Sequence, residues 1–150
     1  MVQASAHWYR CKQSYQGAIA LYRRHYSCSH GRYDLSHSIV GPGERVVLIT
    51  ADEDALFVWR RELYRMDGQD GVNCAVFRNE GDVLSSDLII EAERIAWERW
   101  PGERLFTFVN AGRIRSINPG CCFKRAGWSR CGETQTGLLV LEKAGVQLDG

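Results

Sequence analysis

The order of the apolar segments along the chain is the feature that most constrains its fold. Three runs rich in β-branched and aromatic residues lie at positions 45–50, 55–61 and 72–77. Two short polar segments, 51–54 and 67–71, separate them, and segments of this kind join antiparallel hairpins. We therefore predict three strands that are antiparallel neighbours in one sheet.

Amphipathic segments before and after these strands predict two helices. From Ser14, a suitable N-cap, aromatic and aliphatic side chains recur at helical spacing as far as Tyr26. The second helix is predicted to start with Ser85 or Ser86 as its cap. It runs to Trp100, after which a Pro-Gly pair stops it.

Further short elements complete the predicted order. A two-turn helix is expected between Asn118, its N-cap, and Gly127, the residue just after its end. Short strands are expected at 8–12, 105–109, 128–131 and 137–142. The fold class is thus α/β in the α+β sense: one domain over residues 1–150, with a mixed, mostly antiparallel sheet flanked by helices.

The size of the chain suits one globular domain without a structural metal or disulfides. A chain of 150 residues buries about 70% of the surface that its unfolded form exposes. No apolar run approaches the roughly 20 residues of a membrane span, and the N-terminal residues do not have the pattern of an export signal. We expect a cytoplasmic protein that makes no membrane contact and keeps its six cysteines reduced.

Positive charge is concentrated in two segments. Residues 1–33 and 110–131 each contain five Lys or Arg and no acidic residue. Sixteen of the nineteen basic residues are Arg, whose planar guanidinium suits bidentate contacts with phosphate. A GC-rich genome gives the same preference without any phosphate recognition, so a DNA or RNA partner and an ordinary solvated surface both remain open. The candidate nucleic-acid contacts are Arg23, Arg24, Arg113 and Arg115.

The element order, together with residues 72–128, resembles the GNAT superfamily of acyl-CoA-dependent N-acyltransferases. In that family a strand leads into a pyrophosphate-binding turn, Arg/Gln-x-x-Gly-x-Gly/Ala, and then into a helix. The chain keeps the first and fourth residues of this pattern as Arg78 and Gly81 but has Val83 at its last position. A later family element, in outline Asn-x-x-Ala-x-x-x-Tyr-x-x-x-Gly-Phe, is similar to the segment 118–128, in which Phe123 replaces the Tyr.

The resemblance implies a GNAT-like fold and an acyl-CoA cofactor, acetyl-CoA or a related thioester. A glycine lets the backbone of the turn approach a pyrophosphate closely. The helix N-terminus that follows the turn offers N–H donors to it. The cofactor-binding candidates are Phe77, Arg78, Asn79, Gly81, Ser85, Ser86 and Asn118. The chain is also similar to phage-encoded members, including the Mom-type enzymes that acylate adenine in DNA, which implies a nucleobase amine as acceptor.

Acyl transfer to an amine needs a base for the amine and an acid for the departing thiolate. Glu80 and His25 are the candidate bases, although His25 also fits a surface position at a helix end. Phe123, at the position of the family Tyr, has no proton to give. The candidate acids are therefore Ser116, Tyr26, Cys121 and Cys122; Tyr26 equally suits a core position, and Cys122 a buried apolar one.

Three other hypotheses remain open. The residues His25, Cys28 and His30 could hold zinc or iron, but structural zinc sites usually have a second pair of ligands and the chain has no Cys-x-x-Cys. Phe123 is compatible with a catalytically inactive GNAT-like domain that binds nucleic acid or protein. Cys121 could be the nucleophile of a cysteine-based enzyme, for which no His or Asp partner can be assigned.

Overall fold

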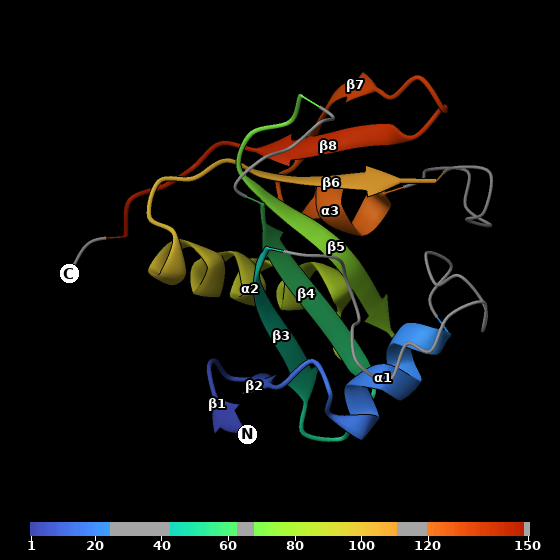
Figure 1. Ribbon diagram of the computed structural model, residues 1–150, viewed down its shortest axis with the longest axis vertical. Coiled ribbons are helices and arrows are strands. Elements are labelled where there is room, and N and C mark those ends of the chain that lie inside the picture. The colour runs from blue at the N-terminus through green and yellow to red at the C-terminus, as the bar shows by residue number, and fades with distance from the viewer. Residues whose placement is uncertain (25–42, 63–67, 111–119, 149–150) are drawn as a thin grey trace.

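The computed structural model describes residues 1–24, 43–62, 68–110 and 120–148. In this part of the chain, eight strands form one sheet and three helices pack on it (Figure 1). The strands are β1 (Val2–Gln3), β2 (Trp8–Cys11), β3 (Glu44–Thr50), β4 (Ala55–Arg61), β5 (Val72–Asn79), β6 (Leu105–Val109), β7 (Ser129–Glu133) and β8 (Leu139–Lys143). The helices are α1 (Gln16–Arg23), α2 (Ser85–Arg99) and α3 (Cys121–Arg125).

The structure confirms the predicted α+β class, with a mixed and mostly antiparallel sheet and packed helices, and the predicted sequence of elements. Its strand order is β1-β2-β3-β4-β5-β6-β8-β7. Each described pair of neighbours is antiparallel except β5 and β6, which are parallel and joined through α2. The short edge strand β1 was not predicted, because two exposed residues carry no periodic signal.

Helix α2 is anchored to the sheet by indole groups. Trp8 Nε1 donates to Leu88 O over 2.9 Å, and Trp59 Nε1 donates to Ala92 O over 2.8 Å. Both indoles are fully buried in the core between the sheet and the helices α2 and α3. The opposite face of β3, β4 and β5 is covered by α1. The sheet thus has a core on each face, and α2 is fixed in position by directional bonds as well as by apolar contact.

The predicted caps of α1 and α2 are wrong. Helix α1 begins at Gln16 with Tyr15 in the N-cap position, one residue after the predicted cap Ser14, and has no side-chain cap. The carboxylate of Glu53, from the β3–β4 hairpin, lies where a Cβ on Gly17 would have to be, and Tyr15 Oη donates to it. This carboxylate therefore supplies, from another element, the negative charge that stabilises a helix N-terminus.

Helix α2 begins at Ser85, and Leu84, not Ser85 or Ser86, is its N-cap. Its end at Arg99 is within one residue of the prediction. Helix α3 begins at Cys121 with Gly120 as N-cap, at a φ of 76°, so the described helix starts later than the Asn118 cap predicted. Asn118 itself lies outside the described residues. Gly127 follows the helix at a φ of 98°, as predicted.

None of the helices in the described part of the chain combines the length and the apolar character that a membrane crossing requires.

A buried ion pair connects α2 to the C-terminal hairpin. The Glu93 side chain is 3% exposed, and it accepts hydrogen bonds of 2.7 Å from Trp128 Nε1 and from Lys143 Nζ. Lys143 Nζ also donates to Ala126 O over 2.7 Å. Burial raises the pKa of Glu93 against the opposing effect of these donors. The carboxylate is therefore stable only while its partners remain in place.

Replacing Lys143 with Met should destabilise the fold by about 3 kcal/mol, because it leaves a buried carboxylate unpaired. This loss of unfolding free energy is at the low end of the range for breaking a buried ion pair, because the Lys143 side chain is 27% exposed. Urea unfolding followed by circular dichroism measures it. Arg94→Met is the matched control, because Arg94 pairs with Glu98 on the surface and should cost about 0.5 kcal/mol or less. Equal losses in the two variants would contradict the assignment.

Candidate functional site

The candidate site lies where the two parallel strands of the sheet separate. Strands β5 and β6 are paired only at Val72–Leu105, Asn73–Phe106 and Cys74–Thr107. Beyond these pairs β5 continues to Asn79, and the two ribbons diverge (Figure 1). In open sheets the carboxyl ends of parallel strands, at a change of strand direction, are where ligands bind. Among the described residues, no strand pairs with the later part of β5 on its β6 side.

A β-bulge in β5 causes the separation. Trp59 pairs with Cys74 and Val58 with Val76, so Ala75 has no opposite residue. An extra residue of this kind bends its strand, and the bend falls where the pairing with β6 ends. Thr107 Oγ1 donates over 3.0 Å to Cys74 O, so a side chain satisfies the last carbonyl of the parallel ladder. The strand itself extends two residues beyond its predicted end at Phe77, so Arg78 and Asn79 belong to β5.

Asn79 organises the turn between β5 and α2. Its Nδ2 donates to Val83 O over 2.7 Å and to Ser85 Oγ over 2.9 Å, and its Oδ1 accepts from Gly81 N over 3.0 Å. Ser85 Oγ is thereby occupied by Asn79 and does not cap the helix. The amides of the first helical turn, at Ser85 and Ser86, thus have no side-chain cap among the described residues. These amides are the available donors at the positive end of α2.

The space beside Gly81 is occupied by a side chain of the protein itself. A Cβ at this position would collide with the carboxylate of Asp54, the residue that precedes β4. The neighbouring amide of Glu80 donates to Asp54 O over 2.7 Å. A bulky residue at Gly81 would therefore disturb the β4–β5 contact, and its effect on binding could not be separated from its effect on folding.

Arg78 points to the opposite side of the strand from Asn79, toward the end of α1. Its Nη1 donates to Arg24 O over 2.7 Å, and its Nε donates to the Glu80 carboxylate. Arg24 binds the same carboxylate through Nε, at 2.7 Å, and Nη2, at 3.0 Å. The hydrogen bonds from Arg24 and then Arg78 lower the pKa of Glu80 to about 2. Glu80, predicted as a base, is therefore a weak proton acceptor in this arrangement.

Aromatic side chains fill the region between the end of β5 and α3. Phe123 is buried, with its ring centroid 5.9 Å from Phe77 and 4.9 Å from Trp128. The two thiols of α3 lie in different surroundings. Cys122 packs against the apolar core, and its burial raises its pKa. Cys121 is half-buried at the first residue of α3, and it is the described acid candidate nearest to the start of that helix.

Several predicted site residues lie outside the described part of the chain. They are His25, Tyr26, Cys28, His30, Arg113, Arg115, Ser116 and Asn118. Their assigned roles stay predictions. Arg23 is described and is exposed at the last residue of α1. Among residues 1–24, 43–62, 68–110 and 120–148, no three His, Cys, Asp or Glu side chains form a group that could hold a metal ion.

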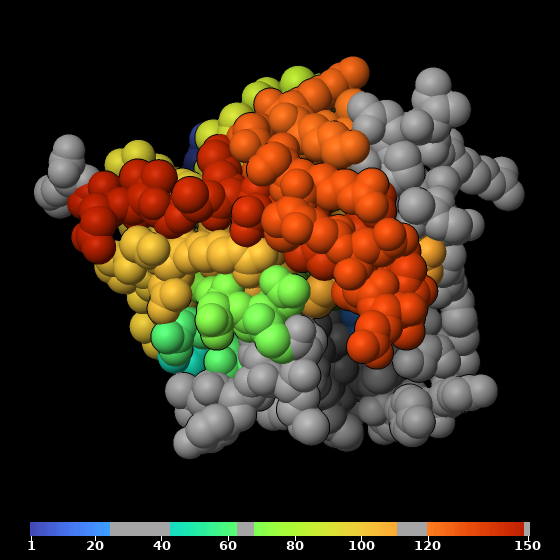
Figure 2. All heavy atoms as spheres, turned by 90° about the horizontal axis from the view of Figure 1, so that it is seen from above, coloured from blue at the N-terminus to red at the C-terminus, as the bar shows by residue number. Residues whose placement is uncertain are grey.

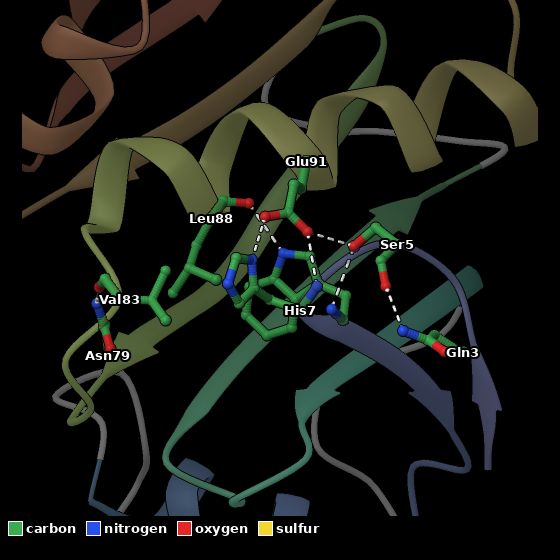
Figure 3. Close-up of polar contacts among 8 residues, drawn as sticks. Gln3, Ser5, His7, Asn79, Val83, Leu88 and Glu91 are labelled. Atoms are coloured by element: carbon green, nitrogen blue, oxygen red, sulfur yellow. Dashed lines mark hydrogen bonds and ion pairs between the residues drawn. The ribbon is translucent and has the colours of Figure 1, made fainter.

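A polar cluster that the sequence did not predict ties the N-terminal segment to α2 (Figure 3). Glu91 accepts bonds from Ser5 Oγ at 2.6 Å and His7 N at 2.9 Å, and its other oxygen lies 2.5 Å from His7 Nδ1. Burial acts to raise the pKa of Glu91, but the bonds from Ser5 and His7 outweigh it and lower the pKa. These residues are more than eighty positions from Glu91, so no local pattern could have connected them.

A cavity of about 750 Å³ lies on the face seen in Figure 2, where the 68–71 turn and the β7–β8 hairpin are side by side. Its charged lining residues are Arg104, Glu133 and Glu142. Arg104 donates to Glu142 over 2.6 Å and to Gln69 Oε1 over 3.1 Å. Arg104 also donates to the thiol of Cys131 over 3.4 Å. The arginine of this cavity is thus engaged in holding the turn and the hairpin together.

No family model, curated protein or solved structure matches this chain. The chemistry of the site therefore has to be inferred from its own residues.

Arg24→Gln should raise the pKa of Glu80 from about 2 toward its ordinary value of 4.5, because Arg24 is the larger cause of the shift. An NMR titration of the Glu80 side-chain carboxyl carbon measures this, with Arg94→Gln as the control. Since the folded-state pKa is the lower one, the stabilisation is present above about pH 4.5 and is lost as the pH falls toward 2. An unchanged pKa in Arg24→Gln would contradict the arrangement.

Proposed function

We propose that the protein is an acyl-CoA-dependent N-acyltransferase of the GNAT type. The observation that carries the proposal is the early separation of β5 and β6, the parallel pair of the described sheet, with α2 leaving the end of β5. The strand order β2-β3-β4-β5-β6-β8-β7 and the turn that begins at Arg78 support it. An acyl-CoA would enter between the two strands, where no described strand pairs with the later part of β5 and its backbone could bind an extended amide chain.

The free amides of α2 are suited to the cofactor's pyrophosphate. Ser85 and Ser86 offer N–H donors at the positive end of a 15-residue helix, without a competing side-chain cap. Two exposed acidic side chains also lie here, Asp82 in the turn and Asp87 in the first turn of α2. These carboxylates repel a phosphate, so the helix amides have to supply the attraction at short range.

In the proposed reaction the acceptor amine attacks the thioester carbonyl, so that a C–N bond forms and the C–S bond breaks. The amine loses a proton, and the CoA thiolate gains one. Cys121, whose thiol lies at the first residue of α3, is the described residue proposed as the donor. Glu80 is too weak a base while Arg24 holds it, so the amine proton would pass to water or to a group outside the described residues.

A second candidate function is a GNAT-like domain that binds without catalysis. Phe123 favours it, because a buried phenyl ring packed on Phe77 and Trp128 stands where the family has a Tyr. Binding of acetyl-CoA without any transfer to amines would favour this alternative over the enzyme.

Ser85→Pro should weaken acetyl-CoA binding by about tenfold or more, because it removes one amide that donates to a charged group. Proline is tolerated at the first position of a helix, and the φ of −60° and ψ of 129° at Leu84 suit a residue before proline. Ser85→Ala is the matched control, since it removes the hydroxyl and keeps the amide. Isothermal titration calorimetry decides: no binding to the wild type, or equal affinities in the two variants, would refute the proposed site.

Asp82→Asn should tighten acetyl-CoA binding several-fold at low ionic strength, because it removes an exposed negative charge from the same turn. The gain should shrink in 1 M salt, where the Debye length is about 3 Å. The same calorimetric titration at two salt concentrations measures it. Equal affinities of wild type and variant at low salt would place the pyrophosphate elsewhere.

A further inference from the structure

We propose that Arg24 and Arg78 form a binding site for a phosphate monoester, and that Glu80 keeps this site closed by occupying it. The proposal concerns the α1 side of the β5–α2 turn, whereas the proposed cofactor amides lie on the α2 side. It does not depend on acyl transfer, because phosphate monoesters occur in nucleotides and in the termini of nucleic acids as well as in CoA.

The geometry is that of an anion held by two guanidinium groups. Arg24 approaches Glu80 side-on, with one N–H donor for each carboxylate oxygen, at 2.7 and 3.0 Å. Arg78 donates to the Oε2 that also accepts from Arg24 Nε. The bond from Arg78 Nη1 to Arg24 O, at 2.7 Å, holds the two arginines together independently of Glu80. The pair would therefore persist if the carboxylate moved away.

The two arginines retain unused donors. Each guanidinium has five N–H groups, and among the described residues Arg24 Nη1 and Arg78 Nη2 meet no acceptor. A carboxylate has only two oxygens, both of which are already engaged. A phosphate group presents three terminal oxygens and could accept from these donors as well.

Charge balance favours a monoester over a diester. The two arginines carry +2 and Glu80 carries −1, so these three side chains together carry one net positive charge. A phosphate monoester carries about −1.5 to −2 at pH 7 and neutralises both arginines. A phosphodiester carries −1, which equals the charge of Glu80, and it competes with a carboxylate that is tethered next to the arginines. The site should therefore discriminate against the internal phosphates of a nucleic acid.

The cluster is accessible to a ligand. The side chains of Arg24, Arg78 and Glu80 are 48%, 33% and 31% exposed. Ion pairs at this exposure contribute little to stability, so the carboxylate can be displaced without a large cost in folding. Glu80 follows the last residue of β5 directly, and its backbone is held by the bond from its amide to Asp54 O. Its side chain alone would have to move.

The test measures binding of methyl phosphate and dimethyl phosphate by calorimetry. The wild type should bind methyl phosphate in preference to dimethyl phosphate. Glu80→Gln should tighten methyl phosphate binding by about tenfold, because the competing tethered anion is lost. Adding Arg24→Gln or Arg78→Gln to Glu80→Gln should abolish that gain. Glu98→Gln and Arg94→Gln, which alter the exposed pair at the far end of α2, are the charge-matched controls.

Three results would overturn the proposal: no gain in Glu80→Gln, an equal gain in Glu98→Gln, or full binding without Arg24 and Arg78. Melting temperatures confirm that each variant is folded, and Glu80→Asp, which keeps the charge but shortens the reach, should show part of the gain. Comparing CoA with dephospho-CoA, and oligonucleotides with and without a 5′-phosphate, identifies the source of the monoester. If CoA binds equally with and without its 3′-phosphate and methyl phosphate does not bind, the acyltransferase proposal stands and this one fails.

Discussion

The end of the parallel pairing between β5 and β6 is the constraint on which the rest of the site depends. The pairing stops at Cys74 and Thr107, where the bulge at Ala75 bends β5 and the Thr107 hydroxyl satisfies the last carbonyl. Without the bulge, β5 would continue beside β6. The backbone N–H and C=O groups on that side of β5 would then be used in hydrogen bonds between the two strands. The bulge also sets which side chains of the strand end face α2 and which face α1.

The position of α2 relative to this strand end is fixed by polar bonds inside an apolar core. The indoles of Trp8 and Trp59 bind helix carbonyls, and Glu93 binds Trp128 and Lys143. Apolar packing alone tolerates small shifts, whereas buried hydrogen bonds lose their full value when a partner moves. These bonds therefore hold the helix N-terminus, with its free amides, at a constant distance from β5.

The β5–α2 turn has two chemically different sides. Asn79 organises the side toward α2, where backbone amides provide the donors. Arg78 organises the side toward α1, where two guanidinium groups hold Glu80. Successive side chains of a strand point to opposite faces of the sheet, so the side chains of residues 78 and 79 lie on opposite sides. The two proposals use these two sides separately, and each can hold without the other.

The sequence by itself determined the element order, the antiparallel β3–β4–β5 unit and the stop of α2, because these depend on side-chain periodicity and on local turn residues. It also singled out the turn from Arg78 to Ser86. Only the tertiary structure decided that the Glu53 carboxylate lies beside the start of α1, that Asn79 donates to the Ser85 hydroxyl, and that Glu80 lies between Arg24 and Arg78. Each of these depends on residues brought together by the sheet: Arg24 and Glu80 are 56 positions apart, and a local pattern holds no information over that distance.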